Sequence, residues 1–342
     1  MPDLGKPRRF LGGLYTAHAS VGSLGAHLVG PVKADRGSQA VDERRIIRAR
    51  QPQGFWMDYR SPSSVQEAVA LLAAHDGAAH VLAGGTDLLV KLRTGFVDPK
   101  LVVDVKGIPR LRAIESDARG FRIGAAASCA EIGEHAGVMA AWPGVVEALR
   151  LIGSTQIQGR ATLGGNLCNA SPAADSVPAL IAAGALCQIA GPGGEREVPV
   201  ENIVSGPGRT SLARGEFVVG FRLEKPRQRS GDAYLRLIPR TEMDIAVVGV
   251  GVALTLDQTG VCTHARVGLG AVAPTPLLVA EAARALIGSR VDDKALAALA
   301  AATSAACKPI DDKRGTVAYR VKVAGVLARR AARIARERAA GR

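Results

Sequence analysis

The sequence predicts an α+β fold, in which a mixed region of short strands and helices is followed by a smaller C-terminal domain. Two observations lead to this prediction. Between residues 55 and 222 the strand patterns are short and alternate with helical patterns, without the long regular βαβ repeats of a doubly wound sheet. After residue 231, three consecutive strand patterns predict an antiparallel meander, and helical patterns complete the chain.

Capping boxes and apolar periodicity define the elements of the mixed region. Ser64-Val65-Gln66-Glu67 opens a helix that ends near Gly77. Ser128-Cys129-Ala130-Glu131 opens a helical region that runs to about Ile152, with a break at Pro143. The remaining predicted elements are strands at 80–83, 101–104, 121–125, 185–190, 197–200 and 217–222, and helices at 88–93 and 175–183.

The turn-rich stretch 225–231 marks the domain boundary, so that residues 54–226 and 231–335 are predicted as two domains. The C-terminal domain is expected to hold strands at 234–238, 245–256 and 261–269 and helices at 279–287, 292–306 and 317–340. The last helix sets a few apolar side chains against many arginines, which predicts a docking or capping helix rather than a membrane anchor.

Residues 1–53 show no sustained periodicity. We expect a disordered extension, or a segment upstream of a true start at Met57. The pair Arg8-Arg9 is followed by an apolar run that His18, Ser20 and Ser23 interrupt, so the pattern does not favour twin-arginine export.

The composition narrows the class of protein. The five cysteines are scattered and include no C-x-x-C pair, which argues against disulfides, zinc or a protein-borne iron–sulfur cluster and favours a reducing, cytoplasmic setting. No stretch approaches the ~18–20 apolar residues of a membrane span. The net charge of +13 gathers near the two ends, and only 4% of residues are aromatic, so nucleic-acid binding is not expected.

Two glycine pairs carry the strongest functional pattern. Leu82-Ala83-Gly84-Gly85-Thr86-Asp87 and Ala161-Thr162-Leu163-Gly164-Gly165-Asn166 each set a Gly-Gly pair beside a hydroxyl or amide side chain, with an acid nearby; Asp175 is the acid of the second. Adjacent glycines allow close approach of the backbone to a ligand, and consecutive N–H groups can hold phosphate oxygens. The patterns therefore predict a bisphosphate gripped from both sides, with two ordinary tight turns as the alternative.

These stretches, together with Arg240-Thr241-Glu242-Met243-Asp244-Ile245-Ala246, resemble the FAD-binding medium subunit of molybdenum hydroxylases, the family of the xanthine and carbon monoxide dehydrogenase flavoproteins. Further matches occur at 151–154, 206–210, 309–312 and 319–320, and the resemblance covers roughly residues 55–335. It implies a PCMH-type FAD-binding domain of two α/β subdomains. A C-terminal domain with a three-stranded antiparallel sheet and helices would follow.

The resemblance also implies roles for particular residues. The FAD pyrophosphate would be held by Leu82, Ala83, Gly84, Gly85, Thr86, Asp87, Thr162, Leu163, Gly164, Gly165 and Asn166. Asp175 would accept hydrogen bonds from FAD hydroxyls, Ile152 and Val218 would line the flavin or adenine pocket, and Tyr234 and Arg236 would lie beside the isoalloxazine. The alternatives are a helix N-cap for Asp175, a half-buried strand residue for Tyr234 and a salt bridge for Arg236.

By this resemblance the chain is an electron-transfer subunit. It would take electrons from two [2Fe-2S] clusters of a small subunit, after reaction at the molybdenum cofactor of a large subunit, and pass them to NAD, a quinone or dioxygen. A dimer of heterotrimers is implied, and no catalytic residue or metal ligand is expected in this chain. The alternatives are a free-standing PCMH-type flavin oxidoreductase that acts directly on a small molecule, and a non-enzymatic basic binding protein.

Overall fold

The computed structural model describes residues 47–50, 56–75 and 77–341. Most of the predicted N-terminal extension, residues 1–46, lies outside the described residues. The expectation of no element before residue 54 is wrong for Ile47–Arg50, which form strand β1. This strand pairs antiparallel with β2, Trp56–Arg60, from Ile47 opposite Tyr59 to Arg50 opposite Trp56.

The first subdomain is a four-stranded sheet in the order β1-β2-β4-β3, in which β2 and β3 (Ala79–Leu82) lie parallel to β4 (Leu101–Asp104). All residues of β4 are buried, as expected for a central parallel strand. Helix α1, Val65–Ala74, covers this sheet and begins at the predicted cap, where the Ser64 hydroxyl accepts from the Glu67 N–H. Helix α2, Leu88–Arg93, follows β3.

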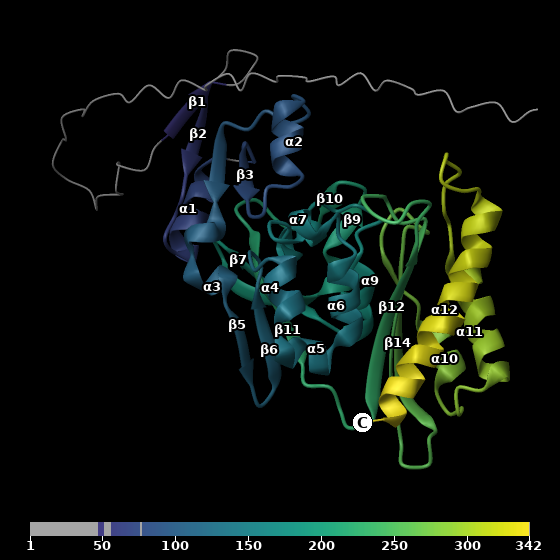
Figure 1. Cartoon of the computed structure of the whole chain (residues 1–342). Helices are drawn as coiled ribbons and strands as arrows, with labels where there is room; N and C mark the ends of the chain where they lie inside the picture. Colours follow the sequence, from purple (N-terminus) through teal and green to yellow (C-terminus); the bar gives the residue numbers. More distant parts are fainter. Residues whose placement is uncertain (1–46, 51–55, 76, 342) are drawn as a thin grey trace, which may run out of the picture. The chain divides into compact units, whose positions relative to one another are not determined.

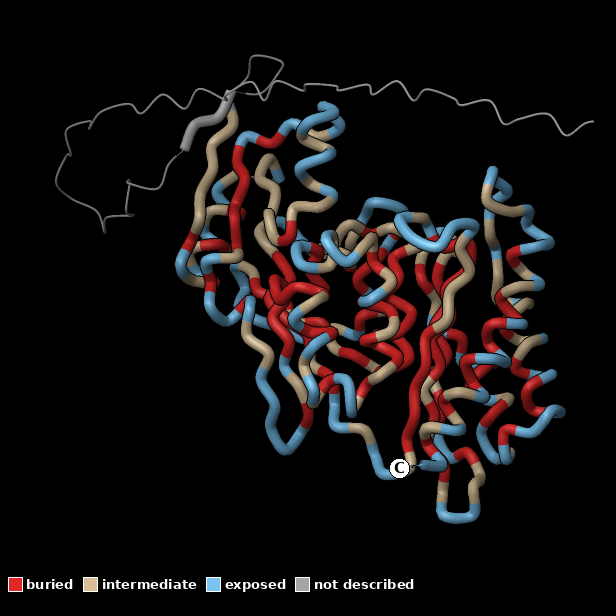
Figure 2. The backbone as a smooth tube through the Cα atoms, in the orientation of Figure 1, coloured by how far each residue is buried: buried red, intermediate tan, exposed pale blue. Residues whose placement is uncertain are grey.

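The second subdomain is built on an antiparallel sheet in the order β5-β6-β11-β7-β8. Its strands are β5 Ile114–Asp117, β6 Gly120–Gly124, β7 Leu186–Gly191, β8 Gly194–Pro199 and β11 Phe217–Glu224. The helical region predicted at 128–152 is confirmed as α4 Cys129–Glu134, α5 Ala136–Ala141 and α6 Pro143–Arg150, with Pro143 at the start of α6. Helix α9, Ser176–Ala183, is buried along its whole length, as Figure 2 shows.

The C-terminal domain contains the predicted antiparallel sheet. Its long strands are β12 Ser230–Leu237, β13 Val248–Leu256 and β14 Cys262–Gly270, and a two-residue strand, β15 Leu277–Leu278, extends it beyond the three that were predicted. Helices α10 Ala280–Leu286, α11 Asp293–Ala306 and α12 Val317–Ala340 follow. Figure 1 shows α12 running along the sheet; its alanine-rich face packs there, which confirms a capping role.

The opposite face of this sheet packs on α9 of the second subdomain, and glycines make the contact possible. A Cβ added to Gly251 would lie 2.8 Å from the carbonyl carbon of Pro178, and one added to Gly268 would lie 3.0 Å from it. Real Cβ atoms are hardly ever found so close to backbone, so only glycine fits at these two strand positions. The two parts of the chain therefore meet backbone to backbone.

Several short elements escaped the sequence prediction. They are α3 Pro109–Arg112, α7 Thr155–Gln158, β5, β9 Val204–Gly206 and β10 Arg209–Thr210. One correction concerns the second glycine pair: it does not form a loop but lies in the first turn of helix α8, Leu163–Cys168.

Candidate functional site

The two glycine stretches, about eighty residues apart in the sequence, lie side by side and line one pocket of about 260 Å³. They touch directly, because a Cβ added to Gly84 would lie 2.8 Å from the carbonyl carbon of Arg160 and 3.1 Å from the Cα of Ala161. The predicted residues that line this pocket are Ala83, Gly84, Gly85, Thr86, Asp87, Ile152, Thr162, Gly164, Gly165, Asn166 and Val218.

The first stretch is a loop between β3 and α2 that lies in the wall of the pocket. Gly85 has a φ of 83°, a left-handed conformation that glycine adopts without strain. Within the described residues, no hydrogen-bond partner exists for the backbone N–H groups of Gly84 to Asp87. Four successive free N–H groups beside a pocket are the arrangement that holds phosphate oxygens in backbone nests.

The second stretch uses its polar groups differently from the prediction. Thr162 caps helix α8, its hydroxyl accepting from the Gly165 N–H at 3.1 Å. The Gly164 N–H donates to the Ala125 carbonyl at 3.0 Å, and the Asn166 N–H to the Thr162 carbonyl at 2.9 Å. These N–H groups are therefore taken up by the fold. The stretch contributes to the pocket mainly through close glycine backbone and the positive end of a short helix.

A polar bridge that the sequence reasoning missed joins the two stretches. The Lys91 ammonium donates to Oδ1 of Asn169 at 2.6 Å, and Nδ2 of Asn169 donates to Oδ1 of Asp87 at 3.2 Å. Lys91 and Asn169 both line the pocket. Lys91 lies one helical turn after Asp87, a local signal that could have identified it, whereas Asn169 is 78 residues further along the chain. The pocket thus holds one cation close to the free N–H groups.

His80 and Cys168 also line the pocket. The pKa of His80 is lowered by burial and, in addition, by the charge of Lys91. Burial raises the pKa of the Cys168 thiol to about 12, so this sulfur stays protonated and unreactive at neutral pH. The remaining lining includes the apolar side chains of Leu212 and Phe217 beside the predicted Ile152 and Val218. It also includes one acid, Glu216, whose carboxylate is paired with Arg196 at 2.8 Å.

The other predicted residues do not line this pocket. Leu163 is fully buried in the core, and Leu82 ends strand β3. Asp175, Tyr234 and Arg236 form a separate buried cluster. There the Tyr234 hydroxyl donates to Oδ1 of Asp175 at 2.8 Å, and the Arg236 guanidinium donates to Oδ2 at 2.8 Å.

This cluster is nearly closed to solvent, with 4% of the Arg236 side chain and 11% of the Asp175 side chain exposed. Burial raises the pKa of Asp175 to about 6, although Arg236 and Tyr234 act in the opposite direction. Asp175 occupies the N-cap position of α9 without capping it, and Tyr234 is buried rather than half-buried. The next residue, Ser176, donates to Oδ1 of Asn166 at 2.6 Å, so one bonded step connects the cluster to the pocket wall.

Within the part of the chain that the structure describes, no group of three or more His, Cys, Asp or Glu side chains could hold a metal ion. Over the same residues, no helix has both the length and the apolar character that crossing a membrane requires.

Two protein-family models match the chain. Residues 54–226 match the family model described as the FAD binding domain in molybdopterin dehydrogenase. Residues 233–335 match that of the CO dehydrogenase flavoprotein C-terminal domain.

Individual relatives agree with these models. The chain is 34% identical over 282 residues to the carbon monoxide dehydrogenase medium chain of Afipia carboxidovorans, covering 82% of this chain and 97% of the relative. It is 33% identical to a putative xanthine dehydrogenase FAD-binding subunit of Escherichia coli, covering 64% and 75%. A solved carbon monoxide dehydrogenase chain from Hydrogenophaga pseudoflava superimposes with a TM-score of 0.79 at 34% identity, covering 82% of this chain and 98% of that one.

Proposed function

The chain belongs to the family of FAD-binding medium subunits of molybdenum hydroxylases, and we propose that it relays electrons from the [2Fe-2S] clusters of a partner subunit to an external acceptor. It is an oxidoreductase subunit, and the molybdenum and iron–sulfur cofactors of such enzymes belong to other subunits. NAD, a quinone or dioxygen is the proposed acceptor, and a dimer of heterotrimers the proposed assembly.

The single observation that carries this proposal is the row of four free backbone N–H groups from Gly84 to Asp87, beside Lys91, in a pocket shared by both glycine stretches. A bisphosphate needs convergent donors, and an ammonium adds an opposite charge. The residues present therefore fit the pyrophosphate of FAD. When bound, FAD supplies the ability to accept electrons singly and release them in pairs.

We assign the individual residues as follows. Gly84, Gly85, Thr86 and Asp87 bind phosphate oxygens through their N–H groups, and Lys91 neutralises charge. Helix α8 holds the opposite wall through Gly164 and Gly165, while Ile152 and Val218 exclude water with apolar surface. Asp175, Tyr234 and Arg236 form a support behind the wall, at the cluster that Ser176 connects to Asn166.

The location that best fits these features is the cytoplasm, since five free cysteines suit a reducing compartment. A free-standing flavin oxidoreductase is the second candidate. It would need a substrate space over the flavin, and it would turn over without partner subunits.

The visible spectrum of the purified chain tests the central claim. We expect a flavin spectrum, and we expect heat denaturation to release FAD. A colourless chain that also fails to take up added FAD contradicts the proposal. Turnover of a small molecule by the isolated flavoprotein would instead favour the free-standing enzyme.

A further inference from the structure

Two stretches singled out in the sequence, 240–246 and 309–312 with 319–320, take no part in the pocket, yet the structure joins them. Nε of Arg314 lies 3.3 Å from Oδ1 of Asp244, and Nε of Arg240 lies 3.2 Å from Oδ2 of the same residue. Asp244 therefore ties the loop between β12 and β13 to the segment that leads into α12.

Arg320 connects these loops through hydrogen bonds, and its side chain is only 4% exposed. It donates to the carbonyl of Val247 at 2.7 Å, to that of Ala271 at 3.3 Å and to Oδ1 of Asp312 at 2.7 Å. A buried guanidinium with this many acceptors fixes both loops in one arrangement.

These fixed loops hold apolar side chains out in solvent. Met243 has a φ of 52°, a left-handed conformation that is unusual for a residue of this type and strains the backbone. The Arg240 guanidinium stabilises it by donating to the Met243 carbonyl at 2.9 Å. The exposed apolar residues of these loops, which we call the loop patch, are Met243 at 55%, Ile245 at 52%, Ile310 at 70%, Val317 at 39% and Tyr319 at 47%.

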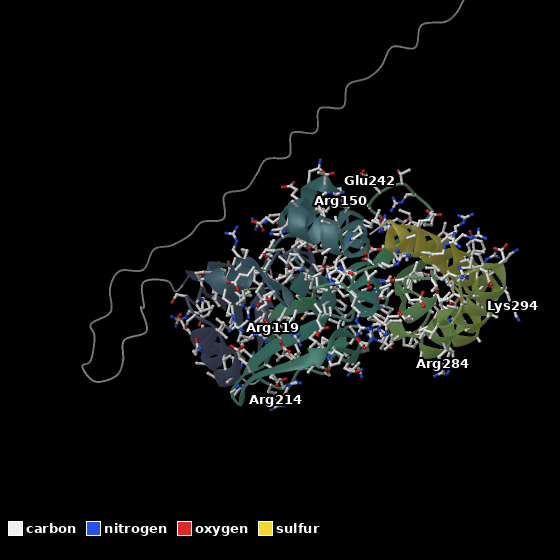
Figure 3. The ribbon with its side chains drawn as sticks, turned by 90° about the horizontal axis from the view of Figure 1, so that it is seen from below. Arg119, Arg150, Arg214, Glu242, Arg284 and Lys294 are labelled. Carbon is white, nitrogen blue, oxygen red and sulfur yellow. The ribbon has the colours of Figure 1, made fainter. Side chains whose placement is uncertain are left out.

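The surroundings of the loop patch are basic. Lys308, Lys313 and Lys322 make no ion pair with any described residue, whereas Glu242 is the one nearby acid that makes neither an ion pair nor a hydrogen bond within that part of the chain. Figure 3 shows Glu242 projecting from the surface on this loop. An apolar centre with a cationic rim is complementary to an apolar surface ringed by carboxylates.

We propose that the loop patch docks the iron–sulfur subunit that exchanges electrons with the FAD. The inference rests on the proposed function for the identity of this partner. A second copy of the chain would bring the same cations to the rim, and like charges across an interface are unfavourable. The position also suits electron exchange, because β12 carries Tyr234 and Arg236 to the buried cluster and then leads directly into the patch loop.

The test measures binding of the purified iron–sulfur subunit to the FAD-loaded chain. The test variant combines Met243→Asp with Ile310→Asp; both side chains are exposed, and aspartate tolerates positive φ better than methionine, so folding is preserved. The matched control is Ile287→Asp, a residue 45% exposed just beyond α10, far from Glu242 as the position of Arg284 in Figure 3 indicates.

We expect the double variant to bind the iron–sulfur subunit at least about tenfold more weakly and the control to bind unchanged. We expect Lys313→Glu to weaken binding too, most strongly at low salt. Equal binding by the double variant and the wild type overturns the inference. So does loss of the molybdenum subunit alone, or loss only of self-association in sedimentation measurements.

FAD content, measured on the same samples, separates this inference from the proposed function. If the variants contain FAD as the wild type does and still bind the iron–sulfur subunit normally, only the docking surface is wrong. A chain without FAD whose binding to that subunit depends on the patch would instead refute the FAD role alone.

Discussion

The direct contact between the two glycine stretches makes Gly84→Ala the most informative single substitution. The added Cβ would lie 2.8 Å from the carbonyl carbon of Arg160, with the carbonyl oxygen still nearer, and all of these neighbours are backbone atoms. Ordinary van der Waals contact begins at about 3.4 Å, so the two backbones must move apart. Gly84 has no positive φ, and the effect is therefore steric and not conformational.

Overpacking of this kind typically costs about 1–3 kcal/mol. Because the contact is also the seam between the two sides of the pocket, we expect FAD affinity to fall by more than the loss of stability alone would suggest, at least about tenfold. The affinity is measured by quenching of flavin fluorescence, and the stability by urea unfolding of the apoprotein with the m value compared.

Gly159→Ala is the matched control. Gly159 lies beside Arg160 on the same segment, and a Cβ there would have its nearest neighbour at 3.7 Å, an ordinary contact. We expect this variant to bind FAD as the wild type does. If Gly84→Ala and Gly159→Ala give the same affinity and the same free energy of unfolding, the steric reasoning is refuted.

Two further predictions concern buried charges. Arg320→Leu removes the side-chain donor to the carbonyls of Val247, Ala271 and Gly315, and one of the donors to Asp312. It should lower the free energy of unfolding by about 1–3 kcal/mol, and a loss below about 1 kcal/mol in urea unfolding would contradict the role of Arg320 in fixing the loops. The pKa of Asp175 is about 6 in the fold against an ordinary 3.8, so the folded protein holds this proton more tightly than the unfolded chain does. The stabilisation from protonated Asp175 is therefore complete below about pH 4, and the free energy of unfolding falls as pH rises through 6. Between pH 4 and 6 this loss amounts to up to about 1.4 kcal/mol of unfolding free energy per pH unit, and Asp175→Asn should abolish it. If the free energy of unfolding varies with pH equally in the variant and the wild type, Asp175 does not titrate in this range.

Much of the candidate site could be predicted because the residues that form each of its parts are neighbours in the sequence. A strand followed by Gly-Gly, a hydroxyl residue and an acid places Gly84 to Asp87 in a loop at the end of β3, as the structure shows. The capping box at Ser128 forms in full, and at Ser64 the hydroxyl caps the helix as predicted, since each cap depends only on residues within one helical turn. The Glu67 carboxylate, however, accepts from the Ser63 N–H at 2.8 Å and not from that of Ser64, so the second half of that predicted box is wrong.

The errors arose where distant contacts decide the outcome. Gly164 and Gly165 favour a loop by propensity, but the close approach of α8 to Ala125 requires glycine inside a helix. Strand β5 carries mostly polar, exposed residues and is held by pairing with β6 and by the packing of Ile114 on the core, so it has no apolar pattern to detect. The contact of Asn169 with Lys91 crosses 78 residues, a distance over which spacing carries no information.

The contact of Gly251 and Gly268 with Pro178 has a consequence for how the molecule can be divided. Family models separate the chain between residues 226 and 233, as though two modules were joined by a linker. Because strand backbone rests on helix backbone, removal of either half would expose a surface shaped for this close contact. Because the close atoms of Pro178 are backbone atoms, a half taken from a relative would need glycine at both strand positions whatever residue stood at position 178, so the two halves would have to be exchanged as a matched pair.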